Sequence, residues 1–177
     1  MRPTLFLDFD DVLCLNNPYS GHDVVRPRGY GVAQPADLWE RLFAQSAKDV
    51  LLTVMAEFSP AVVITSSWLA YFERPGMETL LRNCGLLPIA LALHEAWDVP
   101  SVQGKTRLQA IQGWMARHHE GEPFVMLDDV ESGTGLRGSA LEKKGRVVLC
   151  HVNVGLTNEH LPAIRNALVQ IPNIRYD

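Results

Sequence analysis

The chain has few cysteines and no long apolar run. Its 177 residues include 3 cysteines, Cys14, Cys84 and Cys150, which are far apart in the sequence and lie in apolar surroundings. An odd number of scattered cysteines argues against a disulfide framework, so we expect buried free thiols in a reducing cytoplasm. No apolar segment reaches the ~20 residues that a transmembrane helix needs, and the N-terminus lacks a signal-peptide pattern. These absences predict a cytoplasmic protein without a membrane partner.

Basic residues are also fewer than acidic residues in this chain. The chain contains 16 Lys and Arg residues against 20 Asp and Glu residues, which gives a net charge of -4. Non-specific binding to nucleic acid depends on neutralising phosphates, and an acidic chain supports it poorly. Repeats, low-complexity tracts and Pro/Gly-rich linkers are absent as well. The length and the 47% hydrophobic content therefore predict a single globular domain over residues 1–177.

The most informative segment of the sequence lies near its N-terminus, where several carboxylates follow one another closely. An apolar run from Leu5 to Phe9 predicts a short buried strand, and Asp8, Asp10 and Asp11 interrupt its C-terminal end. Ionised carboxylates are costly to bury unless they are paired or bind a metal. Asp8 and Asp10 point to the same side of an extended strand, where they could bind a hard cation such as Mg2+. The alternative is a solvated polar turn after a strand.

The Asp-x-Asp-x-Val pattern of residues 8–12 resembles the first motif of the haloacid dehalogenase (HAD) superfamily. The resemblance implies a Mg2+-dependent phosphohydrolase, in which Asp8 attacks phosphorus to form an aspartyl-phosphate and Asp10 acts as general acid and base. It also implies that Mg2+ is bound by Asp8, by the backbone carbonyl of Asp10 and by one of a later acidic pair. The residue after the second aspartate is usually glycine in this superfamily, whereas this chain has Asp11.

A second strand is predicted at 61–64, where an apolar and β-branched run is followed by Thr65, Ser66 and Ser67. In the HAD series a hydroxyl at this place binds a phosphoryl oxygen. We assign that role to Ser66 first and to Thr65 second. A serine in this position is also a good N-cap for the helix that follows, and capping alone would explain its presence.

A lysine near the start of a later helix is the third signal. Residues 104–119 have apolar residues at helical spacing, which places Lys105 in the first turn. A cation there opposes the helix dipole unless an anion is held beside it. We therefore predict that Lys105 contacts the phosphoryl group, and the alternative is an ordinary solvated surface lysine.

An acidic pair after another buried strand is the fourth signal. Residues 123–127 are continuously apolar, as in a central strand of a parallel sheet, and Asp128 and Asp129 follow at once. Adjacent carboxylates point to opposite sides of a strand. We therefore expect one of the two to bind Mg2+ and the other to orient water or the lysine, and the residues alone do not decide which.

The alternation of strands and helices predicts an α/β fold, a Rossmann-like doubly wound parallel sheet of about five strands flanked by helices. Further strands are predicted at 146–151 and, as an edge, at 88–93. Helices are predicted at 36–58, 68–83, 104–119 and 157–169. Residues 14–35 are predicted to form a long loop beside the site, and no segment suits a large cap domain. We therefore expect an open site at the C-terminal ends of the strands.

Two short sequence motifs narrow the resemblance to one group within the HAD superfamily. Ser66-Ser67-Trp68 and Gly155-Leu156-Thr157 resemble the small HAD domains of Swiss Army Knife RNA repair proteins. The expected substrate is a phosphomonoester, either a small molecule or a macromolecular end such as a nucleic-acid 3′-phosphate. Arg26 and Arg28, in the loop 14–35, could bind a second anionic group. The alternative function is a non-catalytic HAD-fold domain that binds a phosphorylated partner or nucleic acid.

Overall fold

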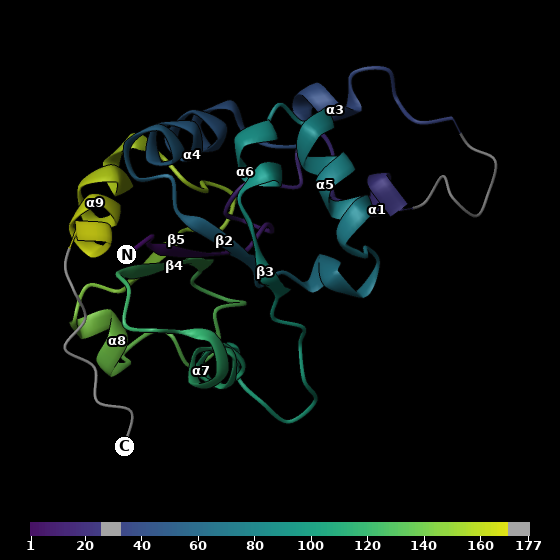
Figure 1. Ribbon diagram of the computed structural model, residues 1–177. Coiled ribbons are helices and arrows are strands. Elements are labelled where there is room, and N and C mark those ends of the chain that lie inside the picture. Colours follow the sequence, from purple (N-terminus) through teal and green to yellow (C-terminus); the bar gives the residue numbers. More distant parts are fainter. Residues whose placement is uncertain (26–32, 170–177) are drawn as a thin grey trace.

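The fold is built on one parallel β-sheet. The computed structural model describes residues 1–25 and 33–169 (Figure 1). Its five strands have the order β3-β2-β1-β4-β5, and all neighbours are parallel. The strands are β1 (Thr4–Leu7), β2 (Ala61–Ile64), β3 (Leu93–Asp98), β4 (Phe124–Asp129) and β5 (Val147–Cys150). The predicted α/β fold with a doubly wound parallel sheet is confirmed.

Helices cover both faces of this sheet (Figure 1). Leu5 and Leu7 of β1 pack into a core that also contains buried residues of α4 (Gln45–Phe58), α5 (Arg74–Asn83), α6 (Leu87–Leu91) and α9 (Leu161–Val169). Phe6 points to the opposite face, where it packs with α7 (Arg107–His118) and α8 (Ala140–Lys143). This alternation follows from the period of two in a strand. Both faces are apolar because the sheet lies between two helical layers.

The shorter elements connect these layers. They are α1 (Gly21–Val25), α3 (Leu38–Arg41) and two 3-10 helices, η1 (Ser67–Ala70) and η2 (Asn158–His160). The helix predicted at 36–58 is broken into α3 and α4, and the one predicted at 68–83 is divided into η1 and α5. The loop predicted at 14–35 includes the short helix α1. No separate cap domain is present among the described residues.

One predicted element is wrong. The edge strand expected at 88–93 is replaced by α6 at Leu87–Leu91, and the edge strand β3 begins only at Leu93. A short, continuously apolar run does not distinguish a strand from a buried helix by periodicity. Pro88 lies in the first turn of α6, where proline is favoured because its missing N–H would have no partner in any case.

The described residues also bear on the cysteines and on membrane insertion. Cys14, Cys84 and Cys150 are buried free thiols, as the sequence predicts, and burial raises the pKa of each to about 12. None of the helices in the described ranges combines the length and the apolar character that crossing a bilayer would require.

Candidate active site

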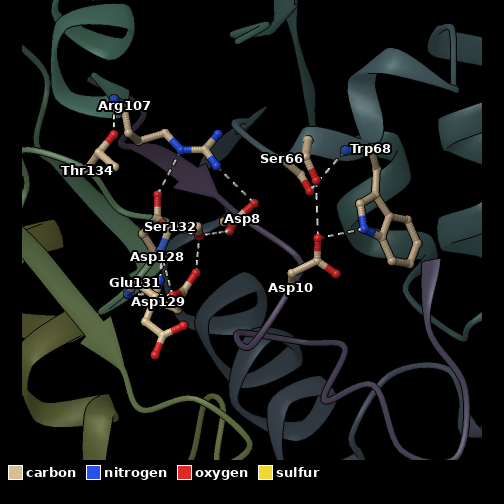
Figure 2. Close-up of polar contacts among 11 residues, drawn as sticks. Asp8, Asp10, Ser66, Trp68, Arg107, Asp128, Asp129, Glu131, Ser132 and Thr134 are labelled. Carbon is tan, nitrogen blue, oxygen red and sulfur yellow. Dashed lines mark hydrogen bonds and ion pairs between the residues drawn. The ribbon is translucent and has the colours of Figure 1, made fainter. Parts of the chain in front are cut away.

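Three buried carboxylates meet where two adjacent strands end. Leu7 of β1 pairs with Leu127 of β4, so Asp8 and Asp128 follow at the same level of the sheet. Asp8, Asp128 and Asp129 each offer a carboxylate oxygen within 4.8 Å of the others, and none is more than 2% exposed. Figure 2 shows the three side chains converging around the hydroxyl of Ser132. This hydroxyl lies 3.2 Å from Asp8 Oδ2 and 3.3 Å from Asp128 Oδ1 and also contacts Asp129.

The acidic pair does not divide as expected. Asp128 and Asp129 were predicted to point to opposite sides of β4, but both reach the same cluster. The reason is that the chain turns sharply after β4. Asp129 Oδ1 accepts hydrogen bonds from the backbone N–H groups of Glu131 at 2.7 Å and Ser132 at 2.8 Å. These bonds hold the Asp129 side chain in the turn, beside Asp128.

Burial disfavours the ionised form of two carboxyl groups in this cluster. Desolvation, followed by the negative charge of Asp128, holds the pKa of Asp8 well above its ordinary value. Desolvation also raises the pKa of Asp128 to about 6, although the charge of Arg107 opposes the shift. A bound divalent cation would offset both effects because it supplies the missing positive charge.

The donor atoms fit a hard cation such as Mg2+. All three cluster ligands are carboxylates, the ligand type that Mg2+ and Ca2+ prefer. Asp8 Oδ1 and Asp128 Oδ2 are buried and accept no hydrogen bond within the described part of the chain. Such oxygens keep lone pairs available for a metal. The predicted Mg2+ ligands Asp8, Asp128 and Asp129 are thus brought together in one place.

Among the described residues, Arg107 is the cation that pairs with the cluster, and sequence reasoning missed it. Its Nε lies 3.2 Å from Asp128 Oδ2, and a terminal nitrogen lies 3.6 Å from Asp8 Oδ1. Both are ion pairs without hydrogen-bond geometry, which agrees with the open lone pairs of the two oxygens. The side chain is only 9% exposed. Arg107 is therefore the buried counter-charge of Asp8 and Asp128.

Lys105 occupies a different place from the one predicted. The helix begins at Arg107, with Thr106 as N-cap, so the prediction that Lys105 lies in the first helical turn is wrong. Thr106 and Gln109 form a capping box, and this Thr-x-x-Gln signal in the sequence could have located the helix start. Lys105 is exposed, and its ammonium group has no hydrogen bond or ion pair among the described residues. It lines a cavity of about 90 Å3 together with Arg107 and Ser132. Its role in phosphate binding stays a prediction.

The carboxylate of Asp10 lies apart from the acidic cluster. Its Oδ2 accepts a hydrogen bond of 3.0 Å from the indole Nε1 of Trp68 (Figure 2). The hydroxyl of Ser67 donates a second hydrogen bond of 3.2 Å to the same oxygen. Desolvation raises the pKa of Asp10, and these two hydrogen bonds oppose the shift. The side chain of Asp10 is thus not one of the three clustered ligands. Binding of Mg2+ by its backbone carbonyl stays a prediction.

The turn after Asp10 explains the residue that departs from the HAD pattern. Asp11 has a φ of 54°, in the left-handed region where glycine is the usual residue. Aspartate is one of the few other residues that enter this region, because its short polar side chain can form local hydrogen bonds. Here Asp11 Oδ1 accepts a hydrogen bond of 2.7 Å from the backbone N–H of Asn153. Asp11 therefore adopts the left-handed conformation that glycine favours, and its side chain ties the turn to the segment after β5.

The two hydroxyl candidates after β2 differ in their contacts. Ser66 caps η1 by accepting a hydrogen bond of 3.4 Å from the backbone N–H of Trp68, which is the capping alternative raised by the sequence. Thr65 is 1% exposed, and its hydroxyl has no hydrogen-bond partner within the described ranges. The cap uses only an acceptor lone pair of Ser66, so both hydroxyls keep their O–H available to donate to an anion, and the contacts do not rank Ser66 against Thr65.

A cavity of about 800 Å3 opens beside Asp10. Its lining combines polar and aromatic side chains, including Asn16, His22, Ser67 and Tyr71. Asp10 is the sole acidic residue in the described lining, which contains no lysine or arginine. Arg26 and Arg28, the predicted second anion site, lie outside the described residues.

Comparison with known proteins agrees with this geometry. Residues 4–161 match the family of HAD domains in Swiss Army Knife RNA repair proteins. No curated protein and no solved structure matches the chain significantly. The family match spans β1 to the start of α9 and includes every motif that converges on the site. The chain therefore belongs to the HAD superfamily, in the family of small HAD domains of Swiss Army Knife RNA repair proteins.

Proposed function

We propose that this protein is a Mg2+-dependent phosphohydrolase that cleaves phosphomonoesters through an aspartyl-phosphate on Asp8. The observation that carries the proposal is the separation of two carboxylates on one short segment. Asp8 lies in a buried acidic cluster with Asp128 and Asp129, whereas Asp10 lies outside it and bonds to Trp68 and Ser67. Two carboxylates in different environments suit two different roles in one reaction.

The proposed metal ligands are Asp8, one or both of Asp128 and Asp129, and the backbone carbonyl of Asp10. Mg2+ bound there would neutralise charge on the phosphoryl oxygens and orient the phosphorus toward Asp8. Arg107 supports the same site because it pairs with Asp8 and Asp128 and limits their mutual repulsion.

Asp8 and Asp10 divide the chemistry between them. A carboxylate oxygen of Asp8 attacks phosphorus while the bond to the leaving oxygen breaks. Asp10 gives its proton to that oxygen, so the product leaves as an alcohol. Asp10 then accepts a proton from water as the water attacks phosphorus, and the bond between Asp8 and phosphorus breaks. The products are an alcohol and inorganic phosphate, and both aspartates return to their starting state.

The remaining site residues are assigned to the phosphoryl group and the substrate. Thr65 or Ser66 would donate a hydroxyl hydrogen bond to a phosphoryl oxygen, and Lys105 would bind another from its exposed position beside Arg107. Arg26 and Arg28 would bind a second anionic group, which suits a macromolecular end such as a nucleic-acid 3′-phosphate. The family match to RNA repair proteins supports such a substrate, and small phosphomonoesters are the other class.

Release of phosphate by purified protein tests the proposal directly. The protein is stripped with EDTA and assayed with and without Mg2+ on 4-nitrophenyl phosphate, on alkyl phosphates and on 3′-phosphorylated oligonucleotides. We expect Mg2+-dependent turnover by the wild type and none by Asp8→Asn. Asp49→Asn, which removes the same charge from an exposed helical position, is the matched control and should be fully active. A wild type that binds these compounds but never releases phosphate would instead indicate a non-catalytic binding domain.

A further inference from the structure

The carboxylate of Asp10 is bound through one of its two oxygens. Both the indole N–H of Trp68, at 3.0 Å, and the hydroxyl of Ser67, at 3.2 Å, approach Oδ2. Oδ1 has no hydrogen bond among the described residues and is not fully buried. Asp10, Ser67 and Trp68 all line the cavity of about 800 Å3. The carboxylate therefore has one fixed oxygen and one that is free to meet a ligand.

The indole that binds Asp10 is itself fixed in place. Trp68 is 3% exposed and packs against Phe9 with ring centres 5.3 Å apart and an interplanar angle of 89°. The ring centres of Phe43 and Phe72 lie 6.0 Å and 6.4 Å from that of Trp68. Gly21 lies against the edge of the indole, and a Cβ added there would come within 2.9 Å of Nε1. Close packing on several sides leaves the N–H one direction, toward Asp10.

We infer that Trp68 is a positioning residue, assisted by Ser67, that orients Asp10 for proton transfer to the leaving group. The inference rests on the proposed phosphohydrolase function and adds a residue to its mechanism. Oδ2 is occupied by two donors, and an oxygen that accepts two hydrogen bonds cannot also donate one toward either of them. The proton of Asp10 therefore resides on Oδ1, the oxygen available to the substrate. Trp68 thereby selects which oxygen delivers the proton.

This orientation matters in one step above all. As the bond between phosphorus and the leaving oxygen breaks, that oxygen receives the electron pair and takes the proton from Oδ1. A poor leaving group such as an alkoxide depends on this proton, whereas 4-nitrophenolate leaves readily without it. A misoriented Asp10 should therefore slow alkyl esters much more than aryl esters.

A second buried tryptophan provides a matched control. Trp114 is 2% exposed and packs edge-on against Phe6 at 5.2 Å. Its Nε1 donates a hydrogen bond of 2.7 Å to the carbonyl oxygen of Ala96. Trp68→Phe and Trp114→Phe each remove one buried indole donor and keep an aromatic ring. The loss of packing is similar, so a difference in catalysis reports the contact with Asp10.

The kinetic test compares kcat/KM for two esters, because kcat/KM reports the steps up to departure of the leaving group. Trp68→Phe is expected to lower kcat/KM for glycerol 2-phosphate by about 10- to 100-fold, and for 4-nitrophenyl phosphate by no more than about 3-fold. Trp114→Phe should leave the ratio between the two esters unchanged. Equal losses for both esters in Trp68→Phe would mean that the indole has only a structural role, and would overturn the inference.

Two milder variants keep the test valid if Trp68→Phe folds poorly. Ser67→Ala removes the second donor from an exposed side chain and should give the same preference for the aryl ester, with a loss of about 3- to 10-fold on the alkyl ester. Gly21→Ala leaves both donors present but displaces the indole, and should reproduce the Trp68→Phe pattern. Retention of the wild-type ester ratio in both variants would also overturn the inference.

A readout without turnover separates this inference from the proposed function. In the 15N-labelled protein, Asp10→Ala should shift the indole N–H resonance of Trp68 and leave that of Trp114 in place. An unmoved Trp68 resonance overturns the inference whatever the activity. A shifted resonance in a protein that hydrolyses none of the esters overturns the proposed function, and with it the catalytic meaning of the contact. A shifted resonance together with selective loss on the alkyl ester supports both.

Discussion

Replacing Asp128 by asparagine is expected to stabilise the metal-free protein at neutral pH. Burial raises the pKa of Asp128 from its ordinary 3.8 to about 6, so between these values the folded chain retains a proton that the unfolded chain has lost. The free energy of unfolding therefore falls as the pH rises from about 4 to about 6, and the full loss persists at higher pH. At about 1.4 kcal/mol for each pH unit, the loss is about 3 kcal/mol at neutral pH.

Asparagine removes this loss and keeps most of the local contacts. It has the size of aspartate, and its side-chain oxygen can still accept the hydrogen bond of 2.9 Å from the backbone N–H of Asp129. The expected gain in the free energy of unfolding is therefore about 2–3 kcal/mol at neutral pH. The gain should shrink as the pH is lowered and vanish below about pH 4, where the wild-type carboxyl is protonated in both states.

Urea unfolding in EDTA, followed by circular dichroism over a series of pH values, measures this effect. Asp49→Asn is the control, because it removes an equal charge from an exposed position and should change little at any pH. Added Mg2+ should stabilise the wild type by about 2.7 kcal/mol at 100 times its dissociation constant, and Asp128→Asn by clearly less. The reasoning is refuted if Asp128→Asn is less stable than the wild type at neutral pH in EDTA, or if its advantage does not depend on pH.

Four further predictions concern the residues and the metal of the site. Asp8→Asn should abolish turnover, because an amide is not a competent nucleophile, and should not destabilise the fold; activity within a few-fold of wild type in excess Mg2+ would exclude Asp8. EDTA should abolish phosphate release and Mg2+ should restore it, whereas Ca2+ should inhibit because it prefers more ligands at longer distances; full activity in chelator would contradict a metal role. Lys105→Ala should lower the rate about 100-fold without changing the unfolding midpoint, since Lys105 is exposed, and Lys143→Ala, also exposed, should do neither. Arg107→Ala should instead cost about 3 kcal/mol or more of metal-free stability, because two buried carboxylates lose their counter-charge; equal melting curves for Lys105→Ala and Arg107→Ala would contradict that distinction.

The sequence was informative wherever a residue follows a buried strand. An apolar run directly precedes or ends at each of three site residues, Asp8, Thr65 and Asp128. Parallel strands place such positions together at the C-terminal ends of the strands. Their convergence could therefore be predicted from order and hydrophobicity alone. The edge strand β3 could not, because a short apolar segment beside Pro88 is compatible with either a helix or a strand.

The sequence was less informative where the site depends on side-chain packing. Arg107 is the first residue of a helix that begins three residues later than the predicted start at residue 104, and only the capping residues mark that start. The bond between Trp68 and Asp10 joins residues 58 positions apart, and no periodicity encodes such a contact. Likewise, Asp128 and Asp129 share one cluster because of the turn that follows them, which the alternation rule for strands does not cover.

The hydrogen bond from Asn153 to Asp11 has a consequence for synthesis on the ribosome. β1 emerges before its partner β4, and Asp128 at the end of β4 emerges 120 residues after Asp8. The clamp on the turn after Asp10 comes later still, because Asn153 lies 142 residues beyond Asp11. A nascent chain that ends before Asp128 therefore cannot assemble the acidic cluster, and is not expected to bind Mg2+ or phosphate esters. The site is complete only when the segment from β4 to Asn153 has emerged and packed beside β1.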